Sequence, residues 1–449
     1  MRVAEDVVLP ADDPALPLVR RAADELGVRA WAVGGYVRDA LLGRPHPDLD
    51  VVVGDGRGIE LAERFASLAG ARPPVVFPRF GTAQVTFRGR MVEFVSARRE
   101  SYDAASRKPE RVEPAGVEED LRRRDFTVNT LLIDMDGRVH DLLGGRADLE
   151  RGVLRTPDDP VRTFEEDPLR MLRAIRFSAQ LGFRLDPALP PVIRRLAHRL
   201  RPPVLSAERV TDELRKMLVS PRPRQAMEQM ASCGLLEVVL PELAACQGVA
   251  QGGWHTHDVF GHSLLTVEYC RPDARLRLAA LLHDIGKPPT AGPGGTFHGH
   301  DVVGAEIAAG ILRRLRVGNA LADDVVALVR LHMRPIYYSS TWSDGAVRRL
   351  ARDAGPLLDP LLELAQADTA ASAYPRPEEV DELAARVRSV LTERPTRFRI
   401  PVDGDDIMRV RGLTPGPEVG RIKRALEELV LDGTLPPDRE TLLAHLRDI

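Results

Sequence analysis

Short apolar runs alternate with turns through the first 150 residues of the chain. Alternating apolar and polar positions predict strands, whereas apolar positions three to four residues apart predict helices. The expected strands are Arg29 to Val33, Asp48 to Val53, Thr82 to Phe87 and Met91 to Val95, with a further hairpin from Leu131 to Leu142 and helices from Tyr36 to Leu42 and Gly58 to Leu68. Turns at Gly89 and Asp136-Gly137 fit the two hairpins. These residues are therefore expected to form a small α/β domain with a mixed sheet.

The pattern becomes helical after Asp158 and is interrupted by proline-rich joints, such as Pro202-Pro203. Four parts are expected: an α+β head (1–150), a helical neck and body (151–250), a histidine-rich helical domain (251–375) and a helical tail (376–449). Within the head, Arg98 to Gly116 is polar and charged without an apolar period. This segment is predicted to be a mobile loop.

Composition places the chain among soluble globular proteins of several domains, with 449 residues, 44% of them hydrophobic and 29% charged. Its apolar stretches are too short to cross a bilayer, and its N-terminal segment has no apolar secretory core. Cys233, Cys246 and Cys270 are scattered and form no CxxC pair, which argues against a disulfide framework or a zinc ribbon. These features favour a cytoplasmic protein with no membrane partner.

The first candidate chemistry lies at the start of the second predicted strand, in Asp48-Leu49-Asp50. Period-two alternation places both carboxylates on one face, where they can share hard cations such as Mg²⁺. Upstream, the turn Gly34-Gly35 opens the helix that carries Arg38, and backbone N–H groups with a guanidinium suit a triphosphate. A lone DxD is usually a pair of surface acids and a lone Gly-Gly a plain turn. Their combination predicts two-metal chemistry at a phosphorus centre.

Four motifs in order resemble the class II tRNA nucleotidyltransferase and bacterial poly(A) polymerase branch of the polymerase-β-like superfamily. They are VGGYVRDALLG, DLD, the RRDxxxN block from Arg123 to Asn129 and the EDxxR block from Glu166 to Arg170. The resemblance implies a polymerase-β-like head on a helical neck, with CTP, ATP and the tRNA acceptor arm as partners. Asp48 and Asp50 would be catalytic and bind Mg²⁺. The implied nucleotide site comprises Gly34, Gly35, Arg38, Arg123, Arg124, Asp125, Asn129, Glu166, Asp167, Arg170 and Arg173.

Asp167 and Arg170 are spaced i and i+3 on a predicted helix, so their side chains can converge on one object. A carboxylate accepts from an exocyclic amine, and a guanidinium donates to ring nitrogen or carbonyl acceptors. Cytosine and adenine present that order of groups, whereas uracil and guanine reverse it. The pair can therefore select CTP and ATP, the role that the family assigns to it. An ordinary salt bridge on a neck helix is the alternative.

Two further features of the head bear on the reaction. Glu93 lies on a predicted strand and is a candidate third metal carboxylate, although an exposed strand glutamate is the commoner explanation. The family's flexible loop is required for adding the terminal A, and Ser101 to Gly116 is expected to supply it. Relatives that add only CC lack this loop, so its presence argues for A addition.

A second candidate site follows from ligand-type residues in the order H…HD…H…H…D. They are His262, His283, Asp284, His300, His332 and Asp368. Imidazoles with carboxylates suit a divalent transition metal such as Ni²⁺, Mn²⁺, Co²⁺ or Fe²⁺, which activates water for phosphoester hydrolysis. The order resembles the HD superfamily of metal-dependent phosphohydrolases, which implies a phosphatase or 2′,3′-cyclic phosphodiesterase. His255, His257 and His298 are candidate substrate contacts or plain loop residues.

The segment from Arg184 to Arg224 is strongly basic, with ten Lys or Arg against four acids. It suits either phosphate contacts or solvated helix faces. At the C-terminus, Pro415 to Pro417 predicts a turn and Val419 to Val430 an amphipathic helix, which either packs or contacts the tRNA body.

Three functions fit these patterns. The first is addition of CCA to the 3′ end of tRNA, with HD phosphohydrolase activity. The second is a same-fold relative, either an A-adding enzyme or a poly(A) polymerase. The mildly acidic end from Leu429 to Ile449 disfavours a poly(A) polymerase, whose C-terminal extension is commonly basic. The third is an HD phosphohydrolase with a non-catalytic RNA-binding head, which the intact Asp48 and Asp50 disfavour.

Overall fold

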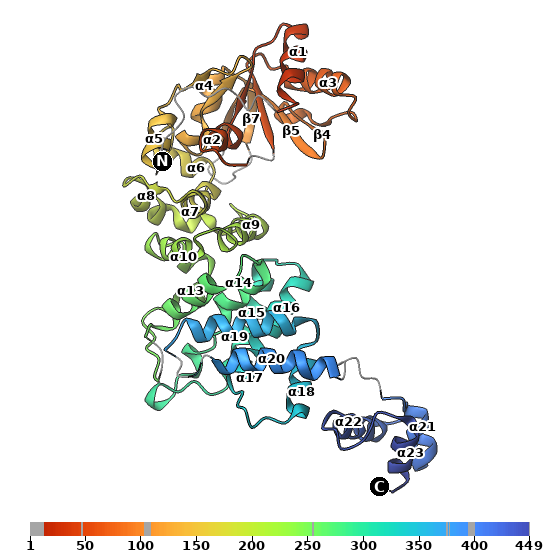
Figure 1. Cartoon of the computed structure of the whole chain (residues 1–449). Coiled ribbons are helices and arrows are strands. Elements are labelled where there is room, and N and C mark those ends of the chain that lie inside the picture. The colour runs from red at the N-terminus through yellow and green to blue at the C-terminus, as the bar shows by residue number, and fades with distance from the viewer. Residues whose placement is uncertain are drawn as a thin grey trace. The chain divides into compact units, whose positions relative to one another are not determined.

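The computed structural model describes residues 13–45, 48–102, 109–253, 256–373, 376, 378–393 and 400–448. The chain divides into two units, Met1–Pro241 and Glu242–Ile449 (Figure 1). The first unit contains the sheets and the helices that follow them, and the second is helical. None of the helices in the described residues has the length and apolar character needed to span a membrane. The predicted boundaries at 150, 250 and 375 stay a prediction.

A seven-stranded sheet lies at the centre of the head, in the order β3-β4-β5-β2-β1-β8-β9. Its strands are β1 (Ala30–Val33), β2 (Leu49–Val53), β3 (Val75–Phe77), β4 (Thr82–Phe87), β5 (Arg90–Ser96), β8 (Leu132–Asp134) and β9 (Val139–His140). Strands β2 and β5 run parallel, whereas the other neighbours run antiparallel. The mixed sheet is therefore confirmed, and only the short edge strand β3 was not predicted.

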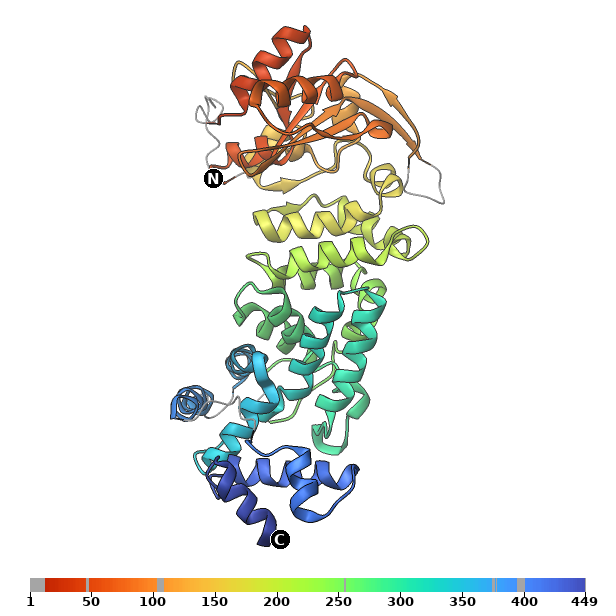
Figure 2. The same ribbon diagram turned by 90° about the vertical axis from the view of Figure 1, so that its right-hand side faces the viewer.

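Helices α1 (Leu16–Leu26) and α3 (Gly58–Ala69) cover one face of this sheet (Figure 1 and Figure 2). Phe65 of α3 packs on Phe94 of β5, with ring centroids 5.2 Å apart. Because successive strand side chains point to opposite faces, Glu93 points away from α3. Asp50 pairs with Glu93 in the parallel register and shares its face. Asp50 and Glu93 thus lie on the face of the sheet opposite to α1 and α3.

The prediction of a mobile loop from Arg98 to Gly116 is wrong for most of this segment. Strands β6 (Arg98–Tyr102) and β7 (Pro109–Pro114) pair antiparallel there as a separate sheet. Backbone hydrogen bonds hold such a hairpin together without an apolar period, which explains why the sequence pattern missed it. Residues 103–108 of the predicted A-adding loop lie outside the described residues.

Helices follow the head as predicted, and they build the rest of the first unit. The head itself contains α4 (Val117–Arg122) and α5 (Gly145–Arg151). After it come α6 (Pro160–Glu166), α7 (Leu169–Leu181), α8 (Leu189–Leu196), α9 (Ala207–Leu218), α10 (Pro223–Ser232) and α11 (Leu236–Val239). One short exception is β11 (Arg184–Leu185), which pairs parallel with β10 (Val153–Leu154). Helix α7 packs against α9 and α10, and its residues are almost all buried.

The second unit joins a helical domain to a tail with its own core. Its helices are α12 (Pro241–Ala244), α13 (Val259–Tyr269), α14 (Ala274–Leu282), α15 (His300–Arg314), α16 (Asn319–Leu331), α17 (Met333–Ile336), α18 (Asp344–Ala354), α19 (Leu358–Ala370), α20 (Glu378–Glu393), α21 (Gly404–Arg411), α22 (Pro417–Leu431) and α23 (Arg439–Asp448). Ile407, Leu426 and Leu442 are fully or almost fully buried in the tail core. Arg352 of α18 binds Glu428 of α22 at 2.7 Å, which ties the tail to the helical domain.

Gly286 allows the turn after α14 to lie against the start of α15. A Cβ at this position would stand 2.2 Å from the carbonyl oxygen of His300 and 2.6 Å from the amide nitrogen of Gly304. Both atoms belong to the backbone, so neither can turn aside as a side chain can. The close approach brings His300 toward the turn that begins with His283.

We expect Gly286→Ala to lower the melting temperature of the full chain, because overpacking against backbone costs about 1–3 kcal/mol. Gly310→Ala is the matched control, since Gly310 is an exposed position of α15 with nothing within 4 Å of an added Cβ. That substitution should leave stability unchanged or raise it by up to about 1 kcal/mol. Differential scanning fluorimetry of both variants measures the difference. Equal melting temperatures would contradict the close approach.

Candidate functional site

The first unit contains a cavity of about 530 Å³ that gathers most of the residues predicted to bind a nucleotide. Eight arginines and four carboxylates line it. Its predicted members are Gly34, Gly35, Arg38, Asp50, Glu93, Arg123, Arg124, Asp125, Asn129, Asp167, Arg170 and Arg173. Asp48 and Glu166, which the sequence also predicted, are not among the lining residues. The excess of guanidinium groups gives the cavity a positive field suited to a polyanion such as a triphosphate.

Two of the carboxylates that line this cavity lie on neighbouring strands, β2 and β5. Asp50 is directly opposite Glu93 in the β2–β5 register, and Gln84 donates to Oε1 of Glu93 at 3.1 Å. The strand begins at Leu49, so the prediction that Asp48 lies within it is wrong, and Asp48 is exposed. The strand pairing begins at Leu49, one residue after the first residue of the motif. Asp48 nevertheless remains close enough for its charge to act on Asp50.

Asp50 occupies a position where its negative charge is costly in the absence of a cation. Burial raises the pKa of Asp50 to about 6. The carboxylates of Glu93 and Asp48 add to this rise, while Arg124 and Arg38 oppose it. A divalent cation would relieve both the burial and the repulsion, and carboxylate oxygens are the ligands that Mg²⁺ prefers. Asp50 and Glu93 therefore offer carboxylate oxygens of the kind that a divalent cation binds.

Gly34 brings the backbone of the Gly-Gly turn against Asp50. Its φ of 76° lies in the left-handed region, and a Cβ there would stand 3.1 Å from Oδ2 of Asp50 and 3.3 Å from Nη1 of Arg124. A side chain would thus intrude between the carboxylate and the guanidinium. The predicted turn is confirmed as the start of α2 (Gly35–Leu41). Its glycine keeps the approach to Asp50 open for a ligand.

A chain of hydrogen bonds joins the Gly-Gly helix to the neck. Arg38 donates to both carboxylate oxygens of Asp39 at 2.9 Å and to Oδ1 of Asn129 at 2.7 Å. Asn129 donates to Oδ1 of Asp125 at 2.9 Å, and Oδ2 of Asp125 accepts from Nε and Nη2 of Arg173 at 2.8 and 2.5 Å. Although burial favours the neutral acid, Arg173 and Asn129 hold the pKa of Asp125 well below its ordinary value. Two motifs that are distant in sequence therefore share one polar network with Arg173, which lies one helical turn beyond the EDxxR block.

The pair Asp167 and Arg170 was predicted to lie on one helix, and this is wrong. Helix α6 ends at Glu166 and α7 begins at Leu169, so Asp167 lies in extended backbone between them. Its Oδ1 accepts from the N–H of Leu169 at 3.1 Å, and Pro168 in the break explains why the first helix stops. Both side chains still line the cavity.

Two backbone carbonyl groups fix the guanidinium of Arg170, one from helix α6 and one from the residue that follows α4 in the head. Nη1 donates to the carbonyl oxygen of Thr163 at 3.0 Å, and Nη2 donates to the carbonyl oxygen of Arg123. Arg170 is only 7% exposed, so this orientation is held by packing as well. Asp167 is less confined and forms an ion pair with Arg209 of α9 at 3.8 Å. The two polar groups thus face the cavity from a rigid frame.

Several lining residues were not found from the sequence. They are Thr82, Val95, Arg98, Arg176, Phe177 and Arg209. Arg176 and Phe177 follow Arg173 by three and four positions on α7, so helical spacing could have indicated them. Arg98 and Arg209 belong to none of the four motifs, and only the folded chain brings them to the cavity.

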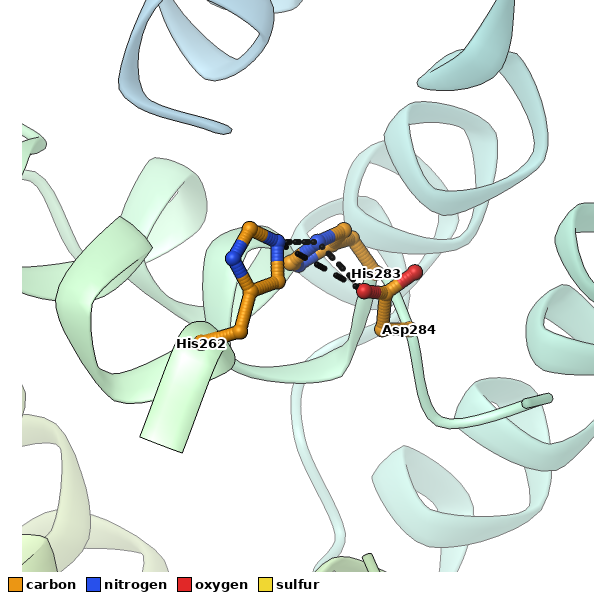
Figure 3. A group of neighbouring side chains, drawn as sticks. All are labelled: His262, His283 and Asp284. Atoms are coloured by element: carbon orange, nitrogen blue, oxygen red, sulfur yellow. Dashed lines mark hydrogen bonds and ion pairs between the residues drawn. The ribbon is translucent and has the colours of Figure 1, made fainter. Parts of the chain in front are cut away.

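The histidine residues of the predicted HD order converge in the second unit. His262 of α13 points toward His283 and Asp284, which follow the end of α14 (Figure 3). Nε2 of His283 lies 3.3 Å from Nε2 of His262 and 3.2 Å from Oδ2 of Asp284. Asp368 of α19 joins them, with Oδ1 2.9 Å from Nε2 of His262. These four side chains form one half of the cluster.

The other half uses the second carboxylate oxygen of Asp284. Its Oδ1 lies 3.4 Å from Nε2 of His300 and 3.8 Å from Nε2 of His332, and these two nitrogens are 3.2 Å apart. The structure therefore brings all six predicted residues together, with Asp284 between the two halves. One carboxylate with an oxygen on each side is suited to bridging two cations.

The orientation of three imidazoles supports a metal site. Each donates Nδ1–H to the carbonyl oxygen three residues earlier: His283 to Ala280 at 2.8 Å, His300 to Phe297 at 2.7 Å and His332 to Val329 at 2.6 Å. This bond directs each Nε2 to the centre of the cluster, as in metal-bound histidines. Burial lowers the pKa of His332 to about 4, so its ring is neutral at pH 7 and able to ligate.

His283 and Asp284 behave as an ion pair in the chain without metal. Burial disfavours the charged imidazole, but Asp284 and Asp368 outweigh it and raise the pKa of His283 to about 8. The pKa of Asp284 is correspondingly held well below its usual value by His283 and Lys287. A metal ion would replace the proton on His283. The donor set of four imidazoles and two carboxylates fits a divalent transition metal.

A cavity of about 340 Å³ opens onto this cluster. Asp284, His300 and Asp368 lie in its wall beside apolar side chains such as Met333 and Ile336. Of the histidines left open by the sequence, His298 lines the cavity, His257 is not among its lining residues, and His255 lies outside the described residues.

The basic segment predicted from Arg184 to Arg224 forms α8, α9 and the start of α10. Seven of its cationic side chains are exposed: Arg184, Arg194, Arg195, Arg201, Arg215, Lys216 and Arg222. Lys216 pairs with Asp212 on the same helix at 2.5 Å. Exposed ion pairs of this kind contribute little to stability, so these residues remain available to phosphate groups.

Known families match the chain in three consecutive regions. Residues 30–155 match the "Poly A polymerase head domain", residues 182–247 the "Probable RNA and SrmB- binding site of polymerase A" and residues 259–373 the "HD domain". With the arginine-lined cavity beside paired carboxylates, these matches define a nucleotidyltransferase of the poly(A) polymerase class that carries an HD domain.

Curated relatives narrow this class. The chain is 38% identical to the A-adding tRNA nucleotidyltransferase of Deinococcus radiodurans, over 89% of this chain and 91% of that one. It is 36% identical to the CC-adding tRNA nucleotidyltransferase of Thermus thermophilus, over 92% of each. The chain therefore belongs to the class II tRNA nucleotidyltransferases, the family of the CCA-adding enzymes, as its motifs predicted.

Solved structures agree with the fold. The Bacillus stearothermophilus CCA-adding enzyme, solved with CTP, superposes with a TM-score of 0.70 at 24% identity over 97% of this chain and 98% of that one. A tRNA nucleotidyltransferase solved with a primer tRNA and an incoming ATP analog superposes with a TM-score of 0.57 at 26% identity, over 83% and 99% of the two chains. The predicted head, neck and HD architecture is confirmed.

We expect Asp50→Asn to stabilise the metal-free protein at pH 7.5. The folded chain raises the pKa of Asp50 to about 6, so above that pH it holds a charge that the unfolded chain accommodates more easily. The amide removes this cost, on the order of 1–3 kcal/mol, and the gain should fade as the pH falls from 6 toward 4.

The matched control is Asp55→Asn, because Asp55 is exposed just beyond the same strand. Its effect should be small at every pH. Melting temperatures of both variants in buffer with a chelator, from pH 4 to 7.5, give the comparison. The assignment of a costly charge to Asp50 fails if Asp50→Asn destabilises the protein at pH 7.5.

Proposed function

We propose that this chain adds CCA to the 3′ end of tRNA from CTP and ATP and releases pyrophosphate. The observation that carries this proposal is the cavity of the first unit, where paired carboxylates, a Gly-Gly turn and the Asp167–Arg170 pair face one another. The terminal hydroxyl oxygen of the RNA would form a bond to the α-phosphorus of the nucleotide. The bond from that phosphorus to the bridging oxygen breaks, and pyrophosphate leaves.

The residues of the cavity divide this work by charge. Asp48, Asp50 and Glu93 would hold Mg²⁺, which lowers the charge barrier to attack on phosphorus when bound. The triphosphate would lie along the turn at Gly34 and Gly35, where guanidinium groups can donate to its oxygens. The arginines placed for this role are Arg38, Arg123, Arg124 and Arg173. Asn129 and Asp125 hold Arg38 and Arg173, and Asp120 holds Arg123 and Arg124.

Base selection would rest on Asp167 and Arg170. The fixed guanidinium of Arg170 donates, and the carboxylate of Asp167 accepts, in the order that cytosine and adenine require. Uracil or guanine would place donor against donor and acceptor against acceptor, which costs about 1–3 kcal/mol for each stranded group. Glu166 would act from outside the cavity, since its Oε2 lies 3.5 Å from Nη1 of Arg170.

The tRNA acceptor arm would lie on the exposed cations of α8 and α9 and of the turns beside them, in the region that matches an RNA-binding family. A relative solved with a primer tRNA and an ATP analog supports both partners. We also propose a cytoplasmic location, which fits the three buried free cysteines.

A second candidate is addition of A alone. The relative from Deinococcus radiodurans carries that name and covers the chain almost end to end, while the relative from Thermus thermophilus is named for CC addition. A further relative, from Neisseria gonorrhoeae, is named multifunctional CCA protein and is 36% identical over 68% of this chain. Complete CCA addition joins both partial activities in one chain, and we favour it because the base-selecting pair suits both nucleotides.

For the second unit, we propose a phosphohydrolase centre with two divalent transition-metal ions, such as Ni²⁺, Mn²⁺, Co²⁺ or Fe²⁺. His262, His283 and Asp368 would hold one ion, and His300 and His332 the other, with Asp284 shared. Such ions supply hydroxide from water at neutral pH when bound. Lys287, 2.6 Å from Oδ2 of Asp284, fixes the shared carboxylate.

Nucleotide addition is tested with tRNA that ends at the discriminator base, at C or at CC, with each labelled NTP and Mg²⁺. A CCA-adding enzyme extends all three and then stops, an A-adding enzyme extends only the CC end, and a poly(A) polymerase continues. Asp50→Ala should lower the rate at least about a hundredfold through loss of metal-assisted charge neutralisation. Asp212→Ala, at an exposed position of α9 outside the cavity, should keep wild-type activity. A wild-type chain that adds nothing refutes the proposal.

Base selection has its own test in Asp167→Ala. We expect this variant to lose discrimination of CTP and ATP against UTP and GTP by about 10- to 100-fold, the effect of leaving an amine unpaired. The measurement is kcat/KM for CTP, UTP and GTP on tRNA that ends at C, and for ATP, UTP and GTP on tRNA that ends at CC. Full selectivity in the variant would show that Asp167 does not read the base.

The metal centre is tested by the metal content of purified protein, measured by inductively coupled plasma mass spectrometry after reconstitution with Ni²⁺ or Mn²⁺. Wild type should hold two ions per chain, His300→Ala one, and His283→Ala at most one. Hydrolysis of bis-p-nitrophenyl phosphate should fall with metal content, whereas nucleotide addition should stay within about twofold. His445→Ala on α23 serves as the control and should keep both ions. Unchanged metal content in both cluster variants would contradict this centre.

A further inference from the structure

The sheet order divides the cavity around Asp50 into two sides. On one side, β1 and α2 carry Gly34 and Arg38. On the other, β5 and β4 carry Glu93 and Thr82, and Arg98 begins the hairpin that follows β5. The proposed triphosphate site occupies the first side. Apart from the magnesium proposed at Glu93, the side formed by β4, β5 and Arg98 has no ligand assigned to it.

The Arg98 side chain is held at the edge of the cavity by several contacts. Its Nη1 donates to the carbonyl oxygen of Phe80 at 2.5 Å and to Oγ1 of Thr82 at 3.1 Å. The guanidinium lies over the Phe80 ring, 5.5 Å from its centroid. The backbone is fixed as well, because its carbonyl oxygen accepts from Nε of Arg123 at 3.2 Å and its N–H donates to Asp120. A cationic side chain is thus fixed in the cavity wall that Glu93 also lines.

The geometry of nucleotidyl transfer indicates which substrate enters on the side of β4, β5 and Arg98. In nucleotidyl transfer the attacking oxygen and the leaving oxygen lie roughly in line through the α-phosphorus. The hydroxyl oxygen forms the new bond while pyrophosphate departs with the electrons of the old one, and the hydroxyl proton passes to water. If pyrophosphate leaves along the Gly34 side, the RNA end has to enter from the Glu93 side. The RNA end carries a phosphodiester that joins its terminal nucleotide, which bears the attacking hydroxyl, to the nucleotide before it.

We infer that Arg98 binds the last phosphodiester of the RNA substrate and positions its terminal hydroxyl beside the carboxylates. A guanidinium presents two parallel donors to a phosphate, a match that a single ammonium cannot reproduce. The hydrogen bond to Thr82 and the contact with the Phe80 ring fix the plane of the guanidinium. This inference rests on the proposed tRNA extension, and it names the ligand of the unassigned side as the 3′-terminal linkage of single-stranded RNA.

The test compares Arg98→Gln with wild type on two versions of tRNA that end at CC. In one, the last linkage is a normal phosphodiester, and in the other it is an uncharged methylphosphonate. Fluorescence anisotropy without nucleotide gives the Kd for each RNA, and steady-state addition of A gives the KM for ATP. Wild type should bind the charged linkage about tenfold more tightly than the neutral one, as for one charge-assisted pair. Arg98→Gln should lose that preference, with the KM for ATP within about twofold of wild type.

Matched variants separate binding from folding and from general charge. Arg88→Asn removes a cation from the same sheet at the opposite end of β4, where Arg88 lies over Phe87 and outside the cavity, and should behave as wild type. Arg98→Lys keeps the charge but loses the fork, so it should retain part of the preference. Melting temperatures check that each variant is folded.

Three outcomes would overturn the inference. A raised KM for ATP with unchanged RNA binding would place Arg98 on the triphosphate. An equal loss on the charged and the neutral linkage would make its role structural. Wild type that itself shows no preference would mean that no side chain reads this phosphate. In each case wild type still extends tRNA, whereas failure of the proposed function would appear as no addition by wild type at all.

Discussion

Repulsion among like charges is the constraint on which the first unit depends. Eight arginines line one cavity, and a bare cluster of that kind would force the surrounding elements apart. The chain of hydrogen bonds from Asp39 through Arg38 and Asn129 to Asp125 and Arg173 divides the charge among partners and fixes each group in place. The head and the first neck helices therefore form one rigid frame, and the remaining positive field is directed into the cavity.

The two candidate sites of the chain differ in how their acidic groups are balanced. In the head, burial raises the pKa of Asp50, and the carboxylates of Glu93 and Asp48 add to the rise despite the nearby Arg124 and Arg38. In the HD cluster, His283 and Asp284 neutralise each other, which raises the pKa of one and lowers that of the other. Carboxylate oxygens suit a hard ion such as Mg²⁺, whereas imidazoles suit a divalent transition metal. Separate donor sets thus allow separate chemistries in one chain.

Both sites could be predicted in part because their residues lie in short, dense motifs. Gly34, Arg38 and Asp50 fall at the ends of strands and the start of a helix, where local pattern determines position. Asp167 shows the limit, since Pro168 breaks the helix on which its spacing to Arg170 was read. The hairpin of β6 and β7 was missed for a different reason: a ladder of backbone hydrogen bonds leaves no hydrophobic signature.

The sequence by itself determined the mixed sheet, the helical neck, the identity of the motif residues and the six ligand-type residues of the HD order. Each of these follows from interactions within a few residues, or from chemical groups that have few other uses. Only the tertiary structure decided that Glu93 lies beside Asp50, that Arg98 reaches the cavity and that Asp284 stands between two pairs of histidines. Such neighbours are set by strand order and helix packing, which depend on contacts between residues far apart in the chain and leave no local pattern to read.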